Sequence, residues 1–512
     1  MRRVAAALVA CAALAMGANS HASEGKVKGR PNIVVIQSDD QVMGQFARSV
    51  MPRTERLLLR RGTRFSDYIA TTAQCCPSRA SLLTGQYPHN HGVRSNAGGY
   101  QALIHKSNVL PVWLQRSGYQ TMHVGKFLTT RGLRVAPGWS EWYTVLGPAA
   151  HYYGYKFSVN GHLRHYGHRR KDNITHVLGS DAARLVNTYA PRRRPFYLQL
   201  DERAPHVGLQ NDPFGACDYA PIPEPRDESR FTTKRLPRPV SFDEADLSDK
   251  PRFLSALPKL KGAAEHQLRK HWRCAAASLA GLDRNVAKVY RAVKRAGELT
   301  RTVFMFISDN GVFFGEHRIR SGKVLPYEEA LHLPLVIRMP KRYRHGATRV
   351  PKVEGAVGNI DLAPTILNLA HARPCSRHRH CRTMDGRSLM PLLTRSGAWP
   401  RDRGLLTEYR VADAGRYATC EFDGIRTSDN IYVVHSRVVN PDTSKCIPAD
   451  ERERYDLKRD PFELNNLCFG GSPANCPADA EQLNLQRRLS RLQNCAGIGG
   501  RDYHVNGRPF CE

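Results

Sequence analysis

Four short runs of apolar residues recur along the chain and give the first indication of its fold. They are 32–37 (NIVVIQ), 195–200 (PFYLQL), 302–307 (TVFMFI) and 333–339 (LPLVIRM). A strand with one solvated face alternates apolar and polar residues, whereas these runs are apolar almost throughout. We therefore expect strands that are buried on both faces.

A long amphipathic helix is predicted between the second and third of these strands. Its apolar positions recur every three or four residues, at Leu268, Trp272, Ala276, Leu279, Leu282, Val286, Val289 and Val293. Gly297 follows the last of them and is a suitable C-terminal cap. Strands that alternate with helices predict an α/β domain built on a large, mostly parallel sheet.

The pattern changes twice along the chain. Residues 207–262 are dense in proline and charge, and we expect them to form a long excursion over the sheet edge. From about residue 400, short strands such as 430–436 (NIYVVHS) are separated by cysteine-containing turns. A chain of this length exceeds one ordinary domain. We therefore predict a large α/β domain over 29–398 and a smaller α+β subdomain with an antiparallel sheet over 399–512.

The N-terminus is typical of an exported protein. Residues 2–3 are basic, 4–18 are apolar, and a small-x-small pattern ends at Ala22. This predicts a signal peptide, 1–22, cleaved near Ala22, because the apolar stretch is shorter than the roughly 20 residues of a membrane span. A lipoprotein-like motif at Cys11 leaves lipidation as an alternative. No later stretch is suited to span a membrane, so we expect a secreted or periplasmic protein.

The chain is strongly basic. Lys and Arg total 77 against 46 acidic residues, a formal net charge of +31. Such a charge attracts polyanions, whether a sulfated glycan, a nucleic acid or an anionic surface. Positive charge spread evenly over a solvated surface has the same composition, so charge alone does not identify a partner.

The cysteine count is consistent with an oxidising compartment. Of 13 cysteines, Cys11 belongs to the signal peptide and Cys75 and Cys76 are adjacent, which leaves ten. Local spacing suggests the pairs Cys217–Cys274, Cys375–Cys381, Cys420–Cys446, Cys468–Cys476 and Cys495–Cys511. Connectivity cannot be derived from sequence, and the loop 375–381 (CSRHRHC) could also be a zinc site. A disulfide-closed loop is the favoured interpretation.

Polar residues follow three of the predicted strands at their carboxyl ends. Asp39 and Asp40 follow the first, Asp309 and Asn310 follow the third, and His206 lies shortly after the second. In open α/β sheets, ligands bind beyond the carboxyl ends of the strands. Each pair alone could be a turn or helix cap. Together, their oxygen atoms suit Ca²⁺ or Mg²⁺, whereas zinc more often binds His or Cys.

The segment 71–93 (TTAQCCPSRASLLTGQYPHNHGV) carries the most specific motif. The pattern C-x-P-S-R-x-x-x-L-T-G is complete from Cys75 to Gly85. It resembles the signature of the sulfatase family, whose first cysteine is oxidised to formylglycine by a separate enzyme. Segments such as 359–370 and 454–467 extend the resemblance over essentially the whole mature chain. Within the family, the chain is most similar to N-acetylglucosamine-6-sulfatases.

This resemblance implies an alkaline-phosphatase-like fold and a defined set of site residues. The implied ligands of one Ca²⁺ or Mg²⁺ ion are Asp39, Asp40, Cys75 as formylglycine, Asp309 and Asn310. The implied catalytic residues are Cys75, Arg79, Lys126, His206 and Lys323. Arg79, Lys126 and Lys323 would neutralise sulfate oxygens. Hydrated formylglycine would attack sulfur with one hydroxyl and expel sulfate with the other by C–O cleavage. His206 is the candidate general acid, with Lys323 as its competitor.

Two departures from the family pattern bear on the substrate. Leu128 stands where many sulfatases have a histidine, a change that the glucosamine-6-sulfatase branch shares. The residues after His206 are Val-Gly-Leu, 207–209, instead of the commoner x-Pro. The resemblance therefore does not define this wall of the substrate pocket.

Three functions are compatible with these residues. The leading hypothesis is removal of the 6-O-sulfate of N-acetylglucosamine in a glycosaminoglycan. The alternatives are hydrolysis of phosphonates or phosphodiesters by the same superfamily, and polyanion binding by a catalytically idle relative. The implied partners are a sulfated sugar and, transiently, the formylglycine-generating enzyme, with no nucleic acid. The sequence leaves the exact glycan, the choice of metal and the oligomeric state open.

Overall fold

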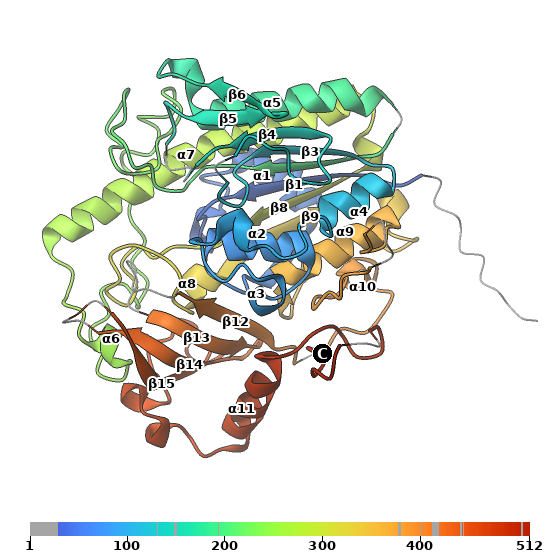
Figure 1. The fold of residues 1–512 in the computed structure, drawn as a ribbon. Helices are drawn as coiled ribbons and strands as arrows, with labels where there is room; N and C mark the ends of the chain where they lie inside the picture. The colour runs from blue at the N-terminus through green and yellow to red at the C-terminus, as the bar shows by residue number, and fades with distance from the viewer. Residues whose placement is uncertain are drawn as a thin grey trace, which may run out of the picture.

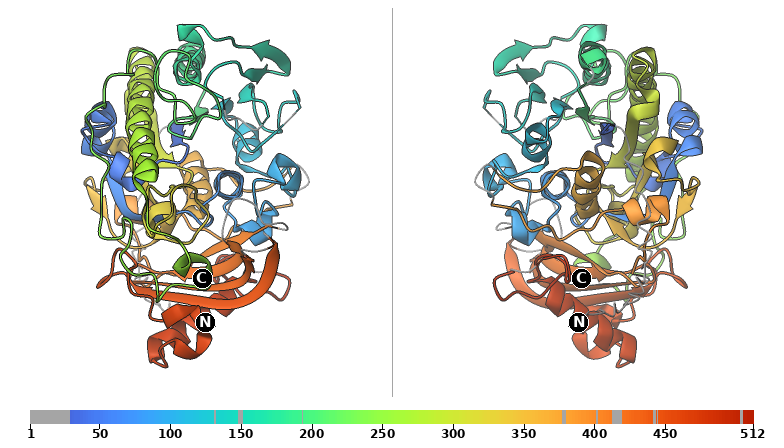
Figure 2. Two further views of the ribbon diagram at one scale, coloured as in Figure 1. Left: turned by 90° about the vertical axis from the view of Figure 1, so that its left-hand side faces the viewer. Right: turned by 90° about the vertical axis from the view of Figure 1, so that its right-hand side faces the viewer.

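A computed structural model describes residues 29–512, except 131, 148–150, 193, 377–379, 401, 412–418, 441–442, 444 and 503–504. The predicted signal peptide and Cys11 lie outside the described residues. Two β-sheets organise the described chain (Figure 1). The larger sheet lies between two layers of helices, and the smaller one lies beside it with the C-terminal helix (Figure 2).

The larger sheet has the strand order β10-β2-β9-β8-β1-β7-β3-β4-β5-β6, and β11 pairs with β2. Its strands are β1 (Asn32–Ser38), β2 (Thr63–Ile69), β3 (Gln120–Gly125), β4 (Glu141–Val145), β5 (Lys156–Val159), β6 (His162–His165), β7 (Phe196–Asp201), β8 (Thr302–Ser308), β9 (His332–Arg338), β10 (Lys352–Val353) and β11 (Val357–Gly358). The central strands β8, β1, β7, β3 and β4 are parallel. β9 is antiparallel to its neighbours β8 and β2, and β5 and β6 continue the other edge antiparallel. The predicted fold class is confirmed.

Helices cover both faces of this sheet. The α-helices of the described chain are α1 (Pro52–Leu57), α2 (Cys75–Thr84), α3 (Pro88–His91), α4 (Leu110–Arg116), α5 (Ile174–Tyr189), α6 (Arg252–Ser255), α7 (Gly262–Arg295), α8 (Glu328–Leu331), α9 (Leu362–Ala370), α10 (Met390–Thr394) and α11 (Ala480–Leu492). Ile33 and Val35 of β1 face an apolar cluster that includes α2, α4 and α9. Val34 and Ile36 face a second cluster that includes α5 and α7. The two-sided burial explains why the predicted strands are apolar throughout.

The C-terminal part forms the predicted antiparallel sheet. Its strands β12 (Leu405–Arg410), β13 (Thr419–Arg426), β14 (Asn430–Val439) and β15 (Cys446–Asp456) pair in chain order. α11 packs on it through Leu485 and Leu489, and the same apolar cluster also contains Tyr87 and Leu331 of the larger part. The two sheets therefore share a core. The boundary at residue 398 stays a prediction.

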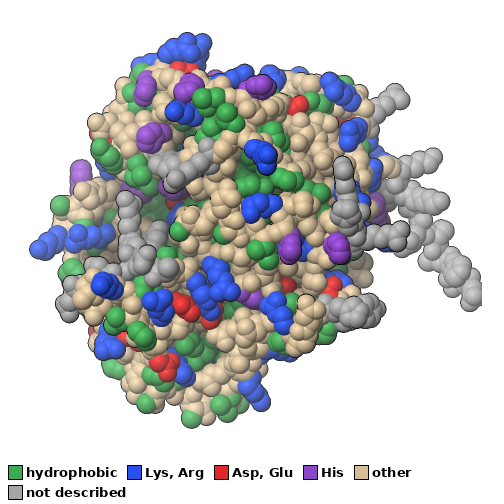
Figure 3. All heavy atoms as spheres, in the orientation of Figure 1, with side chains coloured by type: hydrophobic (Ala, Val, Ile, Leu, Met, Phe, Trp, Pro, Cys, Tyr) green, Lys and Arg blue, Asp and Glu red, His purple; other side chains and the backbone are tan. Residues whose placement is uncertain are grey.

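All five suggested disulfides are present, and Cys75 and Cys76 are free and buried. The bridge Cys217–Cys274 connects the proline-rich excursion to α7. Residues 202–251 form no regular helix or strand, as their composition predicts. Within the described chain, no helix is both long and apolar enough to cross a bilayer. Lys and Arg side chains are spread over much of the face drawn in Figure 3.

Candidate active site

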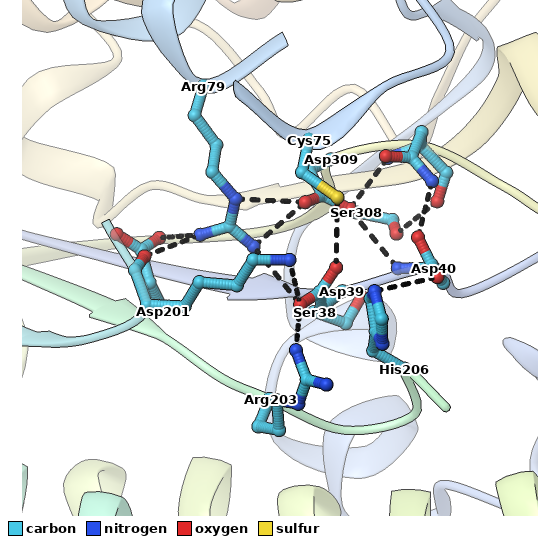
Figure 4. A network of polar contacts seen from close by, with 12 residues as sticks. Ser38, Asp39, Asp40, Cys75, Arg79, Asp201, Arg203, His206, Ser308 and Asp309 are labelled. Atoms are coloured by element: carbon cyan, nitrogen blue, oxygen red, sulfur yellow. Dashed lines mark hydrogen bonds and ion pairs between the residues drawn. The ribbon is translucent and has the colours of Figure 1, made fainter. Parts of the chain in front are cut away.

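The motif cysteine lies where the carboxyl ends of three strands meet (Figure 4). Cys75 is the first residue of α2, whose ten residues are all buried. Asp39 and Asp40 follow β1, and Asp309 follows β8. Because β1 and β8 are adjacent and parallel, their carboxyl ends bring these polar residues to one edge of the sheet. The tertiary structure therefore joins the cysteine motif to the end-of-strand carboxylates.

The sulfur of Cys75 contacts both an acidic and a basic side chain. Its Sγ lies 2.9 Å from Nζ of Lys323 and 3.6 Å from Oδ1 of Asp39. Burial raises the pKa of the Cys75 thiol to about 12, despite the nearby lysines. The unmodified side chain is therefore a neutral thiol at ordinary pH, and a neutral thiol is a poor nucleophile.

Carboxylate and amide groups surround the same point. The backbone N–H of Asp40 donates to Oδ1 of Asp309 at 3.1 Å, and Nδ2 of Asn310 donates to Oδ1 of Asp40 at 2.6 Å. Ligand atoms of Asp39, Asp40, Cys75 and His206 all lie within 4.8 Å of one another. Oδ1 of Asn310 is buried without a hydrogen-bond partner. An unpaired amide oxygen beside clustered carboxylates fits a hard divalent cation such as Ca²⁺ or Mg²⁺.

Each of these aspartates is paired with a basic side chain. Nε of Arg79 donates to Oδ2 of Asp309 at 2.9 Å, and Nζ of Lys126 donates to Oδ2 of Asp39 at 2.5 Å. Nζ of Lys323 pairs with Oδ1 of Asp40. Such buried charges are tolerated only when they are paired and hydrogen-bonded.

These pairs lower the pKa of Asp39 and Asp40, whereas burial and the charge of Asp39 raise that of Asp309 to about 6. Burial on its own would raise the pKa of Asp39, but the charges of Lys126, Arg79 and Lys323 hold that pKa well below its usual value. Burial on its own would lower the pKa of Lys323, but nearby acids, Asp40 first, hold it well above its usual value. The site is therefore a dense array of fixed charges, able to surround a tetrahedral anion with cations.

His206 lies at the mouth of the site. Its Nε2 is 3.6 Å from Oδ2 of Asp40, and its Nδ1 lies 2.8 Å from the carbonyl oxygen of Val207, to which it can donate. Burial and the charge of Arg203 lower the pKa of His206 to about 3. The free site therefore holds a neutral imidazole beside a protonated Lys323.

A pocket of about 760 Å³ opens over Asp40, His206 and Lys323. Its walls come from the excursion, at residues 207–220, and from α7. Polar and aromatic side chains line it together, which is typical of a site that binds a small polar ligand. The segment Val-Gly-Leu that departs from the family pattern lies in this wall.

The position of Lys126 depends on the glycine before it. Gly125 ends β3 with φ +116, and a Cβ built there would lie 1.9 Å from the carbonyl oxygen of Asp201. The same oxygen accepts a hydrogen bond of 2.9 Å from the backbone N–H of Lys126. Only glycine allows this approach. Leu128, two residues after Lys126, packs in the apolar cluster that includes α2.

Two site residues were missed by the sequence analysis. Asp201 lies 3.5 Å from Arg79 and 2.9 Å from Nε2 of His123, whose Nδ1 bonds Thr144. Arg203 lies 3.7 Å from Oδ2 of Asp39. Asp201 is the last residue of β7 and Arg203 comes two residues later, so the same end-of-strand rule could have found them. His123 is fully buried between its two partners and serves to orient Asp201.

Comparison with known proteins relates the chain to sulfatases. The sulfatase family model matches residues 31–372, and the C-terminal model of N-sulphoglucosamine sulphohydrolase matches 315–494. The arylsulfatase of Volvox carteri is 33% identical over 91% of this chain and 75% of that protein. The human N-acetylglucosamine-6-sulfatase is 30% identical over 91% of this chain and 85% of that protein.

A solved structure described as a complex with its substrate, D-glucosamine-2-N,6-O-disulfate, superposes with a TM-score of 0.70. That likeness covers 91% of this chain and 98% of the other at 24% identity, and so concerns the fold. The family model matches about two thirds of the chain, over the segments that carry the cysteine motif, the acids and the basic residues of the site. The chain therefore belongs to the sulfatase family, the hydrolases of sulfate esters.

Proposed function

We propose that this sulfatase removes the 6-O-sulfate of N-acetylglucosamine residues in a glycosaminoglycan and carries formylglycine at position 75. One observation carries the proposal: the sulfur of Cys75 lies 2.9 Å from Lys323 and 3.6 Å from Asp39, among paired acids and bases. The human relative named for this sugar supports the choice of substrate.

The oxygen donors Asp39, Asp40, Asp309 and Asn310 would hold one Ca²⁺ or Mg²⁺ ion together with the modified residue 75. The bound ion would supply positive charge against the oxygens of the sulfate. The unpartnered Oδ1 of Asn310 supports this assignment, because a buried amide oxygen without a donor is costly.

Formylglycine would supply what the thiol cannot. Its hydrate has two hydroxyl groups, one to bond to sulfur and one to expel sulfate and regenerate the aldehyde. A formylglycine-generating enzyme would have to act before the chain folds, since α2 and Cys75 are buried in the folded protein. That order agrees with an exported, disulfide-bonded protein whose signal peptide is cleaved near Ala22.

The basic side chains would bind and orient the substrate sulfate. Lys126 and Lys323 flank the sulfur of Cys75 through their contacts with Asp39 and Asp40, while Arg79 is fixed by Asp309. Cations held by neighbouring acids need no reorganisation when negative charge arrives.

The departing sugar oxygen needs a proton, for which His206 and Lys323 compete. His206 is neutral in the free site, and a sulfate anion beside it would raise its pKa toward the working range. Lys323 already carries a proton and contacts the sulfur of residue 75 directly. In a His206→Gln variant, loss of kcat together with loss of the alkaline limb of its pH profile would assign the proton to His206, because a general acid stops working when it is deprotonated. An unchanged pH profile would assign it to Lys323.

Mass spectrometry of the peptide that contains residue 75, together with sulfate release from defined oligosaccharides, tests the main proposal. We expect formylglycine at position 75, release from 6-O-sulfated N-acetylglucosamine, and no turnover in Cys75→Ala. Cys76→Ala is the matched control, because Cys76 faces Thr129 instead of the charged site. An unmodified thiol in active enzyme would overturn the mechanism.

The same assay separates the alternative functions. Faster hydrolysis of a phosphodiester or phosphonate than of any sulfate ester would favour the second hypothesis. Heparin binding that is equal in the wild type and Cys75→Ala, with no turnover in either, would favour polyanion binding alone.

A further inference from the structure

A second group of ligand-type side chains lies between the two sheets. His317 lies in the loop between β8 and α8, Glu329 lies in α8, and Glu463 follows β15. α8 is located between the larger sheet and β12–β15 (Figure 1). None of these three residues belongs to the candidate active site, although His317 shares its loop with Lys323.

The three side chains converge on one buried space. One ligand atom from each lies within 4.8 Å of the other two, and Nε2 of His317 is 3.9 Å from Oε2 of Glu329. Nε2 of His317, Oε2 of Glu329 and Oε1 of Glu463 are all buried without a hydrogen-bond partner. His317 and Glu463 are both 0% exposed. Three unpartnered atoms in one space are costly unless something binds them.

The remaining polar atom of each side chain is already held. Nδ1 of His317 lies 2.6 Å from Oε2 of Glu244, and the backbone N–H of Glu328 donates to Oε2 of Glu463 at 2.9 Å. Oε1 of Glu329 accepts from a serine hydroxyl at 3.3 Å. A histidine whose Nδ1–H is held by a carboxylate presents the lone pair of Nε2, which is the usual arrangement of a metal-binding histidine.

No lysine or arginine of the described chain neutralises the two carboxylates, and the basic group that approaches Glu329 is the imidazole of His317 itself, at 3.9 Å. Within the described ranges, neither Glu329 nor Glu463 forms a salt bridge with Lys or Arg. The nearby Lys250 pairs with Glu244, and Arg426 pairs with Glu328. Buried carboxylates without a cation require either a proton or a metal ion.

We propose that His317, Glu329 and Glu463 form a second cation site that takes Zn²⁺ or a similar divalent transition ion. One imidazole nitrogen and two carboxylate oxygens suit zinc, whereas Ca²⁺ prefers six to eight oxygen ligands. Tetrahedral ligands about 2.1 Å from zinc lie roughly 3.4 Å apart. Nε2 of His317 and Oε2 of Glu329 are 3.9 Å apart, so they need to approach each other by only about half an ångström to reach that spacing.

Such an ion would connect three segments that are far apart in sequence. It would fix the loop that carries Lys323, the start of α8 and the segment after β15 in the C-terminal part. Its role would be structural, and its loss would loosen the attachment of the C-terminal sheet.

The test uses the full-length protein with its active site saturated with Ca²⁺, so that zinc reports on the second site alone. After metal removal and titration with ZnCl₂, we expect one equivalent of bound zinc by elemental analysis and a rise in Tm. His317→Gln and Glu463→Gln should weaken zinc binding at least tenfold. Glu228→Gln is the control, because that acid belongs to a group whose cysteine is held in a disulfide.

The outcome does not depend on the proposed substrate or on formylglycine, since metal content and Tm are measured without turnover. Crystals soaked with zinc should show an anomalous peak between the three side chains, which needs no variant to fold. Two results would overturn the proposal. In the first, wild-type protein whose active site is saturated with Ca²⁺ binds no zinc. In the second, all three variants bind zinc equally well. The first result would mean that a shared proton occupies the space.

Discussion

The long disulfide Cys217–Cys274 is predicted to stabilise both the fold and the wall of the substrate pocket. Its half-cystines are 57 residues apart in sequence, whereas those of Cys375–Cys381 are 6 apart. According to the chain-entropy relation, removing the disulfide that closes the longer loop lowers the free energy of unfolding by about 4.2 kcal/mol at 25 °C. Removing the one that closes the shorter loop lowers it by about 2.2 kcal/mol. The double variant Cys217→Ala/Cys274→Ala should therefore lose about 2 kcal/mol more than the control Cys375→Ala/Cys381→Ala.

The same difference can be expressed in temperature. With an unfolding entropy of about 2.1 cal/mol/K per residue, a chain of this length has about 1 kcal/mol/K in total. Tm should fall by about 4 °C in the long-loop variant and by about 2 °C in the control. Differential scanning calorimetry of both variants at one scan rate measures this, because a common rate cancels much of the effect of irreversible unfolding.

The long-loop variant should also bind substrate less well. The pocket is lined by residues next to both cysteines, among them Tyr219 and His271. Loosening that wall should raise KM several-fold with little change in kcat, because no proposed catalytic residue lies in it. If the long-loop variant were as stable as the control, the loop-entropy argument would be wrong. If its KM were unchanged, the excursion would play no part in binding.

Three further predictions test other parts of the structure. Gly125→Ala should destabilise the protein by about 4 kcal/mol or more and abolish activity, since its Cβ would clash with the carbonyl oxygen of Asp201. Chemical denaturation measures the stability and sulfate release measures the activity. A stable, active variant would refute the need for glycine. Although burial alone would raise it, hydrogen bonds from His176 and Arg284 lower the pKa of Glu224 to about 2. Because this folded-state pKa lies below the unfolded one, the stabilisation of about 3 kcal/mol is present above pH 4.5 and is lost as pH falls toward 2. Glu224→Gln should thus be less stable than wild type at pH 7 and nearly equal near pH 2; a constant gap across pH would contradict this. Removing divalent ions from the wild type should lower Tm and stop sulfate release; Ca²⁺ should restore sulfate release and part of the lost Tm. Activity that survives thorough chelation would argue against the oxygen-donor metal site.

Much of the site could be predicted from local sequence. The buried strands 32–37 and 302–307 are recognisable because both faces are covered, and the residues after them reach one edge because the strands are parallel. Asp39, Asp40, Asp309 and Asn310 follow from that rule. The disulfide pairs that local spacing suggested are all present, and in each the partner is the next available cysteine along the chain.

Contacts between distant segments could not be predicted in this way. Arg203 and Asp201 lie after a predicted strand, but the sequence does not say that β7 is next to β1, nor that His123 from β3 orients Asp201. The reversed direction of β9 has no local signal, because its apolar residues are the same whichever way it runs.

What the sequence determined by itself is local: which segments bury both faces, where the long helix ends, and which motif contains a modifiable cysteine. These follow from side-chain periodicity and short-range geometry. Only the tertiary structure decided which charges neutralise one another and which are left without partners, such as Nε2 of His317 beside Glu329 and Glu463. The reason is physical: the energy of a buried charge or polar atom depends on everything packed within a few ångströms. Those neighbours come from segments far apart in the chain, 146 residues from His317 to Glu463 and 283 from Asp40 to Lys323.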